Sequence, residues 1–188
     1  MADLIRLGLT KYTLGGALPD LPEGRRILVP GQVEDDASIR LGAGDVATNL
    51  GLLRVVREAN PDAVILYKPH PDVEAGLRDG AVDRAEDWAD MVLPGADTAA
   101  LLDQVEEVWT MTSLMGFEAL LRGLKVTVTG TPFYAGWGLT TDLGRVPVRR
   151  QARPSVQGLA HAALIDYPRY FDPVTRQACS VETAVRRL

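Results

Sequence analysis

The stretch AVILYKPHP, residues 63–71, places an apolar segment directly before a stiff polar turn. A run of apolar residues without alternation is typical of a strand buried on both faces, as in a parallel sheet. The two prolines that follow lack backbone N–H groups and hold the residues before them, Lys68 and His70, in extended conformations. The sequence therefore predicts a buried strand whose carboxyl end presents an ammonium and an imidazole.

Strand and helix patterns alternate on both sides of this stretch. Strands are expected over residues 25–30, 63–67, 91–94, 105–111 and 125–129, and helices over 46–60, 97–104 and 113–122. This alternation is typical of right-handed βαβ units around a parallel sheet. The predicted fold class is α/β, a Rossmann-like parallel sheet flanked by helices. Ligands of such sheets bind beyond the carboxyl ends of the strands.

The length of 188 residues suits one domain, which we expect to have three parts. Residues 1–24 are expected to form an N-terminal helix, over 4–12, and a proline-rich connector. Residues 25–170 are expected to form the Rossmann-like domain, with a binding site for a phosphate-bearing, nucleotide-like ligand. Residues 171–188 are expected to form a helical tail, with a helix near 180–188, and a further helix is expected near 156–165, before this tail.

Composition narrows the classes of function. The formal charge of −5 disfavours nucleic acid as a partner, so an anionic ligand must be held by local groups. The single cysteine, Cys179, excludes an internal disulfide and fits a reducing compartment. No apolar run approaches the roughly 20 residues that span a bilayer, and the first residues lack the apolar core of a secretory signal. We therefore expect a cytoplasmic protein.

An acidic loop, PGQVEDDAS at residues 30–38, leaves the first strand. A carboxylate there, with Asp36 as the candidate, is placed to act as a nucleophile or base on a substrate above the sheet. Alternatively, Asp36 or Ser38 caps a short helix. A magnesium site ranks last, because no second acidic cluster accompanies the loop, and no metal is expected.

Two further motifs follow buried strands. Lys68 and His70 are candidates for binding phosphate oxygens, and His70 is also a candidate for protonating a leaving group; the alternative is an incidental histidine at a strand end. Thr112 and Ser113 open a helix whose free N–H groups suit a phosphate.

The helix that starts there contains a glycine and an acid among apolar residues. Gly116 costs about 1 kcal/mol relative to alanine in a helix interior and therefore indicates a close approach, of ligand or of a neighbouring strand. Glu118 is a candidate for accepting hydrogen bonds from a ribose diol; otherwise it faces water. Ser113 is expected to cap the helix in either case.

An aromatic loop, TPFYAGWGLT at residues 131–140, follows the last expected strand. Three aromatic residues and two glycines within six positions suit the wall of a pocket for a base or sugar ring. The same residues also suit a hydrophobic plug over the strand. The sequence leaves both interpretations open.

Taken together, these motifs resemble those of a known family. Gln32-Val33-x-x-Asp36, Lys68-Pro69-His70-Pro71, Ser113-x-x-Gly116-x-Glu118 and Phe133-Tyr134-Ala135-Gly136-Trp137-Gly138 occur in this order. The chain resembles the capsule polysaccharide biosynthesis and export family of Gram-negative bacteria, the KpsC/KpsS-like β-Kdo glycosyltransferases. The resemblance runs from residue 9 to about residue 170.

The resemblance implies a retaining β-Kdo transferase of GT-B fold that uses CMP-Kdo as donor substrate, with no cofactor and no metal. It implies that Asp36 is the catalytic nucleophile, and that His70 acts in catalysis and contacts the donor phosphate. Donor-binding positions are expected at Gln32, Lys68, His70, Thr112, Ser113, Gly116 and Glu118.

A GT-B enzyme has two Rossmann-like domains, and this length suits one of them. We therefore expect the donor-binding half, inactive alone, whose missing half binds a lipid-linked saccharide acceptor. Association with the capsule export machinery at the inner membrane is a further expectation. The rival functions are a non-catalytic export or assembly module and a GT-B transferase with another donor, such as CDP-glycerol.

Overall fold

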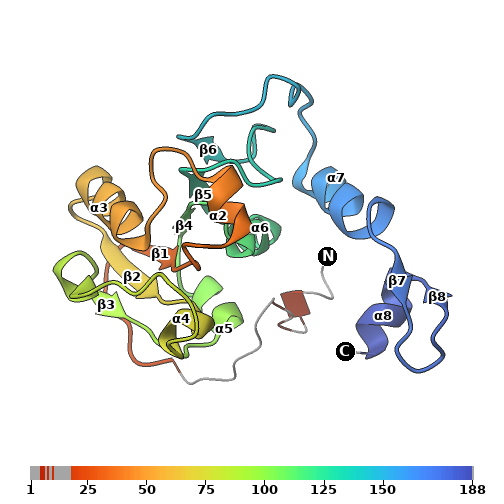
Figure 1. Ribbon diagram of the computed structural model, residues 1–188, viewed down its shortest axis with the longest axis horizontal. Helices are drawn as coiled ribbons and strands as arrows, with labels where there is room; N and C mark the ends of the chain where they lie inside the picture. Colours follow the sequence, from red (N-terminus) through yellow and green to blue (C-terminus); the bar gives the residue numbers. More distant parts are fainter. Residues whose placement is uncertain (1–4, 7, 9, 11–17, 188) are drawn as a thin grey trace.

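The computed structural model describes residues 5–6, 8, 10 and 18–187, and its centre is a six-stranded parallel sheet (Figure 1). The strand order is β3-β2-β1-β4-β5-β6. From β1 the chain builds β2 and β3 on one side, then returns to build β4, β5 and β6 on the other. This order confirms the predicted α/β, Rossmann-like class. The strands are β1 (Arg26–Pro30), β2 (Val64–Lys68), β3 (Met91–Val92), β4 (Glu107–Thr110), β5 (Lys125–Val128) and β6 (Thr141–Asp142).

Both faces of the sheet are buried because successive strand residues point to opposite sides. In β1, Ile27 and Val29 join one hydrophobic core while Leu28 joins the other. Ile65 and Leu66 divide in the same way in β2. The continuous apolar run that predicted a parallel sheet therefore serves two cores at once.

Helices cover the two faces, and Figure 1 shows α3 and α6 with the sheet between them. Residues of α2 and α3 pack in the core of Ile27, and residues of α5, α6 and α7 pack in the core of Leu28. The helices of the sheet domain are α2 (Ala37–Gly42), α3 (Asn49–Ala59), α4 (Pro71–Glu74), the 3₁₀-helix η1 (Ala85–Asp87), α5 (Thr98–Leu102), α6 (Leu114–Leu121) and α7 (Val156–His161), which runs into a π-helix, η2 (Ala162–Asp166).

The observed elements fall within or close to the expected ranges. The strand β6 was not expected, because residues 141–142 are polar and carry no apolar run, yet they pair with β5 in parallel. The short helix α4 was also not expected; Pro71 at its first position and His70 as its N-cap explain it. The helix expected over 4–12 lies for the most part outside the described residues.

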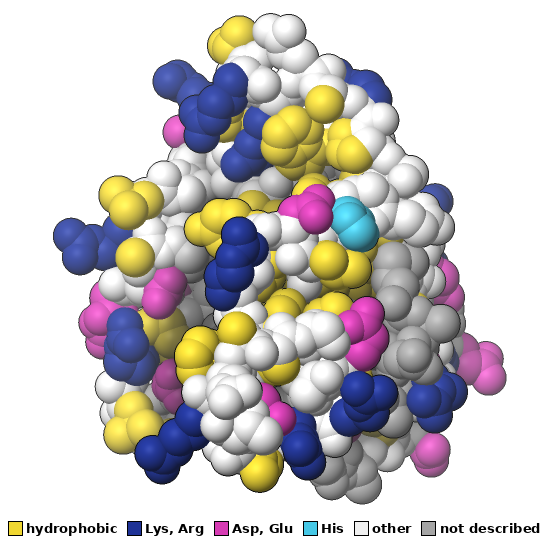
Figure 2. Space-filling view, turned by 90° about the vertical axis from the view of Figure 1, so that its right-hand side faces the viewer, with side chains coloured by type: hydrophobic (Ala, Val, Ile, Leu, Met, Phe, Trp, Pro, Cys, Tyr) yellow, Lys and Arg dark blue, Asp and Glu magenta, His cyan; other side chains and the backbone are white. Residues whose placement is uncertain are grey.

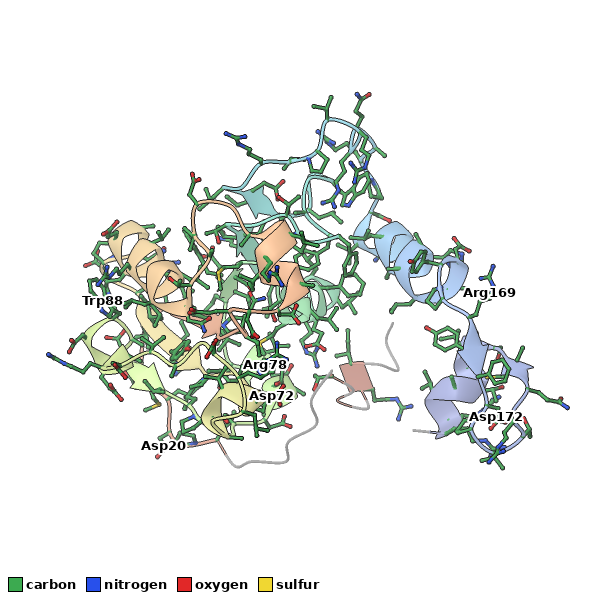
Figure 3. All side chains as sticks on the ribbon, viewed as in Figure 1. Asp20, Asp72, Arg78, Trp88, Arg169 and Asp172 are labelled. Carbon is green, nitrogen blue, oxygen red and sulfur yellow. The ribbon has the colours of Figure 1, made fainter. Side chains whose placement is uncertain are left out.

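The C-terminal part forms a small unit beside the sheet domain, drawn in blue in Figure 1. An antiparallel pair, β7 (Tyr170–Phe171) and β8 (Ala178–Cys179), precedes α8 (Val181–Arg187). Asp172, labelled in Figure 3, closes the turn by accepting hydrogen bonds from the backbone N–H groups of Val174 and Thr175, which lower the pKa of its carboxyl group. The hairpin was not expected, and the three-part division of the chain stays a prediction.

The face that carries this unit is shown in Figure 2, where hydrophobic side chains are spread among arginine and lysine side chains. Tyr167 is 88% exposed, and Phe171 and Val174 are largely exposed as well. No helix among the described residues is long and apolar enough to cross a membrane.

The aromatic loop is a hydrophobic plug rather than an open wall. Tyr134 is fully buried, and the rings of Phe133 and Tyr134 pack against each other and against Phe117 of α6. The Tyr134 hydroxyl donates a hydrogen bond to the Ser113 carbonyl oxygen, one residue before α6. A Cβ atom at Gly116 would collide with the Tyr134 phenol. The close approach expected at Gly116 therefore exists, and a side chain of the aromatic loop makes it.

We predict that Gly116→Ala lowers the free energy of unfolding by about 1–3 kcal/mol, because the new methyl group overpacks the contact with Tyr134. The matched control is Gly158→Ala in α7, where an added Cβ would meet only ordinary contacts. This control is expected to be neutral or to stabilise by up to about 1 kcal/mol through helix propensity. Urea unfolding measures both variants, and equal stabilities of the two would contradict the packing explanation.

Candidate functional site

A pocket of about 50 Å³ opens at the carboxyl edge of the sheet, between β2, β1 and β4. The strand order reverses between β1 and β4, and this switch point is where open α/β sheets bind ligands. The volume has room for a compact group such as a phosphate, and a larger ligand would extend out of it. Its lining residues are Pro30, Gly31, Lys68, Pro69, His70, Pro71, Thr98, Ser113, Leu114, Met115 and Glu118.

Lys68 is the last residue of β2 and is only 3% exposed. Burial lowers the pKa of its ammonium, and the carboxylates of Glu74 and Asp97 oppose that shift only in part. Its ammonium makes no hydrogen bond or ion pair with another described residue. A buried ammonium without a contacting carboxylate is costly, so the position favours an anionic ligand.

His70 follows Lys68 by two residues and caps α4. Its Nδ1 accepts a hydrogen bond from the backbone N–H of Asp72 at 3.2 Å, so Nε2 carries the proton in this arrangement. The Asp72 carboxylate lies 3.9 Å from the same Nδ1. Gly31 allows this turn to pack closely, because a Cβ there would meet the Tyr67 hydroxyl and the backbone of Pro69 and His70.

The third wall is the beginning of α6. Ser113 is the N-cap, and its hydroxyl accepts from the backbone N–H of Met115 at 3.2 Å. Glu118 lies in the second turn and is only 8% exposed, so it does not simply face water. Its carboxylate lies near the Tyr134 phenol, whose pKa burial raises and this charge raises further. The pocket thus combines an N–H-rich helix start with a carboxylate.

Gln32 and Thr112 lie beside the pocket and hydrogen-bond with each other. The Gln32 amide donates to the Thr112 hydroxyl at 2.8 Å and accepts from the Thr112 backbone N–H at 3.0 Å. It also accepts from the Thr110 hydroxyl at 3.0 Å, which in turn accepts from the Ser113 N–H. Gln32 therefore joins the ends of β1 and β4 and holds Ser113 in place, a role that the sequence alone did not indicate.

Asp36 occupies the N-cap of α2, the arrangement that was the alternative to a catalytic role. Its carboxylate accepts from the Ser38 N–H at 2.8 Å, and the residue is exposed. It does not line the pocket, although the Thr112 hydroxyl lies 3.4 Å from the Ser38 hydroxyl. A helix cap and a nucleophile are compatible, because Asp36 is an exposed residue.

An ion pair between Arg78 and Asp35 holds the acidic loop next to Asp36. Arg78 donates two hydrogen bonds to Asp35, at 2.9 and 3.2 Å, and these raise the pKa of its guanidinium, with Asp36 and Asp72 adding to the effect. Figure 3 shows Arg78 and Asp72 together beside α4. The acidic loop is therefore connected to the turn that carries His70.

Thr98 is a polar lining residue that was not predicted from the sequence. It is the first residue of α5, it is 2% exposed, and Asp97 caps the same helix. The available signal was the Asp97-Thr98 pair, separated by two residues from the predicted strand 91–94, which places a hydroxyl near the ligand edge. Among the described residues, no group of three histidine, cysteine, aspartate or glutamate side chains is arranged to hold a metal ion.

Comparison with known proteins gives consistent results. The family model described as capsule polysaccharide biosynthesis protein matches residues 20–170. The capsule polysaccharide modification protein LipA of Neisseria meningitidis serogroup A is 51% identical over 184 residues, which are 96% of this chain and 26% of LipA. The chain therefore spans about a quarter of the length of this relative.

Two solved structures share the fold. The β-Kdo 2,7 transferase of Thermosulfurimonas dismutans KpsC superposes with a TM-score of 0.80 at 36% identity, covering 98% of this chain and 64% of that one. The β-Kdo 2,4 transferase of the same KpsC gives a TM-score of 0.85 at 33% identity, covering 97% of this chain and 58% of that one.

The family model covers most of the chain, including all six strands of the sheet and every residue that lines the pocket. The resemblance inferred from the motifs is thereby confirmed. The chain belongs to the capsule polysaccharide biosynthesis protein family.

Proposed function

We propose that this chain is the donor-binding half of a GT-B, retaining β-Kdo glycosyltransferase that uses CMP-Kdo in the synthesis of the capsular polysaccharide linker. The observation that carries the proposal is the pocket at the switch point, where Lys68, His70, Ser113 and Glu118 line one cavity. The Kdo transferases among the structural neighbours support the choice of sugar.

Each wall of the pocket suits one part of the donor. The start of α6, with Ser113, offers backbone N–H groups and the positive end of the helix to the donor phosphate. His70 donates from Nε2 to the same phosphate and, when protonated, supplies a proton to it as it leaves. Glu118 accepts hydrogen bonds from the ribose diol, and the Lys68 ammonium offsets negative charge of the donor.

In the proposed reaction Asp36 acts by double displacement. A carboxylate oxygen of Asp36 attacks the anomeric carbon of Kdo, the bond from that carbon to the phosphate oxygen breaks, and CMP leaves with the electron pair. An acceptor hydroxyl then attacks the same carbon, loses its proton to a base, and displaces Asp36. Two inversions give net retention.

The acceptor and the location belong to the same proposal. The remaining half of the enzyme binds a lipid-linked saccharide, so the protein works in the cytoplasm at the inner membrane, next to the capsule export machinery. The domain itself binds the nucleotide sugar and needs neither metal nor cofactor.

We predict that CMP binds this domain saturably and more tightly than UMP or AMP, as measured by isothermal titration calorimetry. His70→Ala and Glu118→Gln are each expected to weaken CMP binding by about tenfold or more, because each removes a charge-assisted hydrogen bond of roughly 1.5–3 kcal/mol. The matched control for the histidine is His161→Ala at the end of α7, outside the pocket.

Two results would contradict this reading. Equal binding of CMP, UMP and AMP would contradict the assignment of the pocket to a cytidine nucleotide. Tighter binding of CDP-glycerol than of CMP-Kdo would favour a transferase of glycerophosphate.

We predict that Asp36→Asn in the protein at its full length abolishes transfer of Kdo to a lipid-linked acceptor and leaves CMP binding within about twofold, since the side chain lies outside the pocket. The control is Asp35→Asn, which loses an exposed ion pair with Arg78 worth about 1 kcal/mol or less and is expected to keep most of the transfer activity. Chromatographic detection of the elongated product measures both variants. Full transfer activity in Asp36→Asn would point instead to a non-catalytic export or assembly module.

A further inference from the structure

The pocket contains two separate elements that suit anions. One is the start of α6 with Ser113 and the neighbouring His70, which the proposed function assigns to the donor phosphate. The other is the pair Lys68 and Thr98, from the end of β2 and the start of α5. Both pairs line the same cavity, so a ligand that fills it meets both.

The two carboxylates whose charges raise the pKa of Lys68, those of Glu74 and Asp97, each accept a hydrogen bond from a backbone N–H group. Glu74 accepts a hydrogen bond from the backbone N–H of Gly95 at 3.1 Å, and Asp97 accepts from that of Ala100 at 2.8 Å. Neither lies within ion-pair distance of the Lys68 ammonium, although both act on it from further away. The charge of Lys68 therefore lacks a contacting counter-ion in the part of the chain that the structure describes.

Thr98 shows the same pattern in a neutral group. Its side chain is 98% buried, and its hydroxyl makes no hydrogen bond with the residues that the structure describes. Thr98 also lines the cavity, so a ligand there is a possible partner for this hydroxyl. An ammonium and a hydroxyl, both buried and both on one cavity wall, are the donors that an oxyanion requires.

We infer that Lys68 and Thr98 form a second oxyanion subsite, which binds the carboxylate of a sugar acid beside the phosphate of the donor. This inference rests on the proposed function, which assigns the phosphate to Ser113 and His70. Lys68 and His70 are two positions apart on an extended segment, so their Cα atoms lie about 6.5–7 Å apart and their side chains lie on the same side of the segment. A sugar whose carboxylate and phosphate are attached to the same carbon presents two anions at short separation, as this arrangement requires.

The subsite defines a class of donor. A nucleotide with a neutral sugar would leave the Lys68 ammonium buried without a partner and would bind less well for that reason. A nucleotide of a sugar acid satisfies both elements. The end of β2 would therefore select the acidic sugar, while α6 reads only the nucleotide.

The test compares freshly prepared CMP-Kdo with its methyl ester, which removes the carboxylate charge and keeps the rest of the molecule, and with CMP. Displacement of CMP, followed by fluorescence or calorimetry, gives the three affinities. The unchanged chain is expected to prefer CMP-Kdo over the ester by about tenfold or more, equivalent to 1.4 kcal/mol or more. Lys68→Met is expected to bind CMP-Kdo and the methyl ester equally.

Thr98→Val and Lys68→Arg extend the test. The valine removes only the hydroxyl and is expected to reduce the preference by about threefold to tenfold. The arginine keeps the charge and is expected to retain part of the preference. Matched controls are Lys125→Met, on the exposed first residue of β5, and Thr129→Val, a buried threonine outside the pocket whose hydroxyl is also without a partner among the described residues.

Failure of the subsite and failure of the proposed function give different results. A preference for CMP-Kdo that persists in both Lys68→Met and Thr98→Val overturns the subsite while leaving the proposed function intact. Loss of CMP itself in Lys68→Met assigns the lysine to the phosphate and likewise overturns the subsite. If the unchanged chain binds none of the three compounds, the proposed function fails and the subsite with it. Thermal unfolding of each variant shows which ones are folded, and Thr98→Val carries the test if Lys68→Met is not.

Discussion

The buried side-chain amide of Gln32 is the interaction on which the site depends. Gln32 follows the end of β1, and its amide group makes three hydrogen bonds to Thr110 and Thr112 at the end of β4. These bonds connect the two strands between which the strand order of the sheet reverses. Because the Thr110 hydroxyl also accepts from the Ser113 N–H, the amide sets where α6 begins. Asn49 holds the backbone of Gln32 from the other side, with bonds of 2.8 Å to its N–H and carbonyl groups. The start of α6, which the proposed function assigns to the donor phosphate, is therefore held in place by protein groups alone.

The remaining walls are rigid for similar reasons. Prolines on both sides of His70 restrict the turn after β2, and the packing of Gly31 against that turn leaves no space for a side chain. Tyr134 presses on Gly116 and hydrogen-bonds the carbonyl oxygen of Ser113, so the aromatic loop supports α6 from behind. A rigid site loses little conformational entropy when a ligand binds, and this rigidity suits the proposed donor, which must be oriented for displacement.

The sequence was sufficient to predict the fold, because continuous apolar runs such as residues 63–67 are typical of strands in a parallel sheet whose two faces are both covered by helices. It was also sufficient to place Lys68, His70, Ser113 and Glu118 on one edge, since the carboxyl ends of parallel strands share that edge. The sequence did not distinguish ligand-contacting residues from structural ones. Gln32 and Gly116 belong to the same motifs as Ser113, yet in the structure they contact protein groups. Thr98 was missed because a single threonine at a helix start has no pattern of its own. β6 and the β7–β8 hairpin were missed because two-residue strands form through tertiary pairing rather than local propensity.

The central claim is that one pocket at the reversal of the sheet binds the nucleotide of the donor. The most direct measurement is two-dimensional ¹H–¹⁵N NMR of the domain during addition of CMP, which reports every backbone amide at once. The claim predicts saturable shifts confined to Gly31, the turn at residues 68–72, the start of α5 and the first turns of α6, with little change in β7, β8 and α8. Shifts that concentrate in the C-terminal unit and leave residues 68–72 and 113–118 unmoved would contradict it.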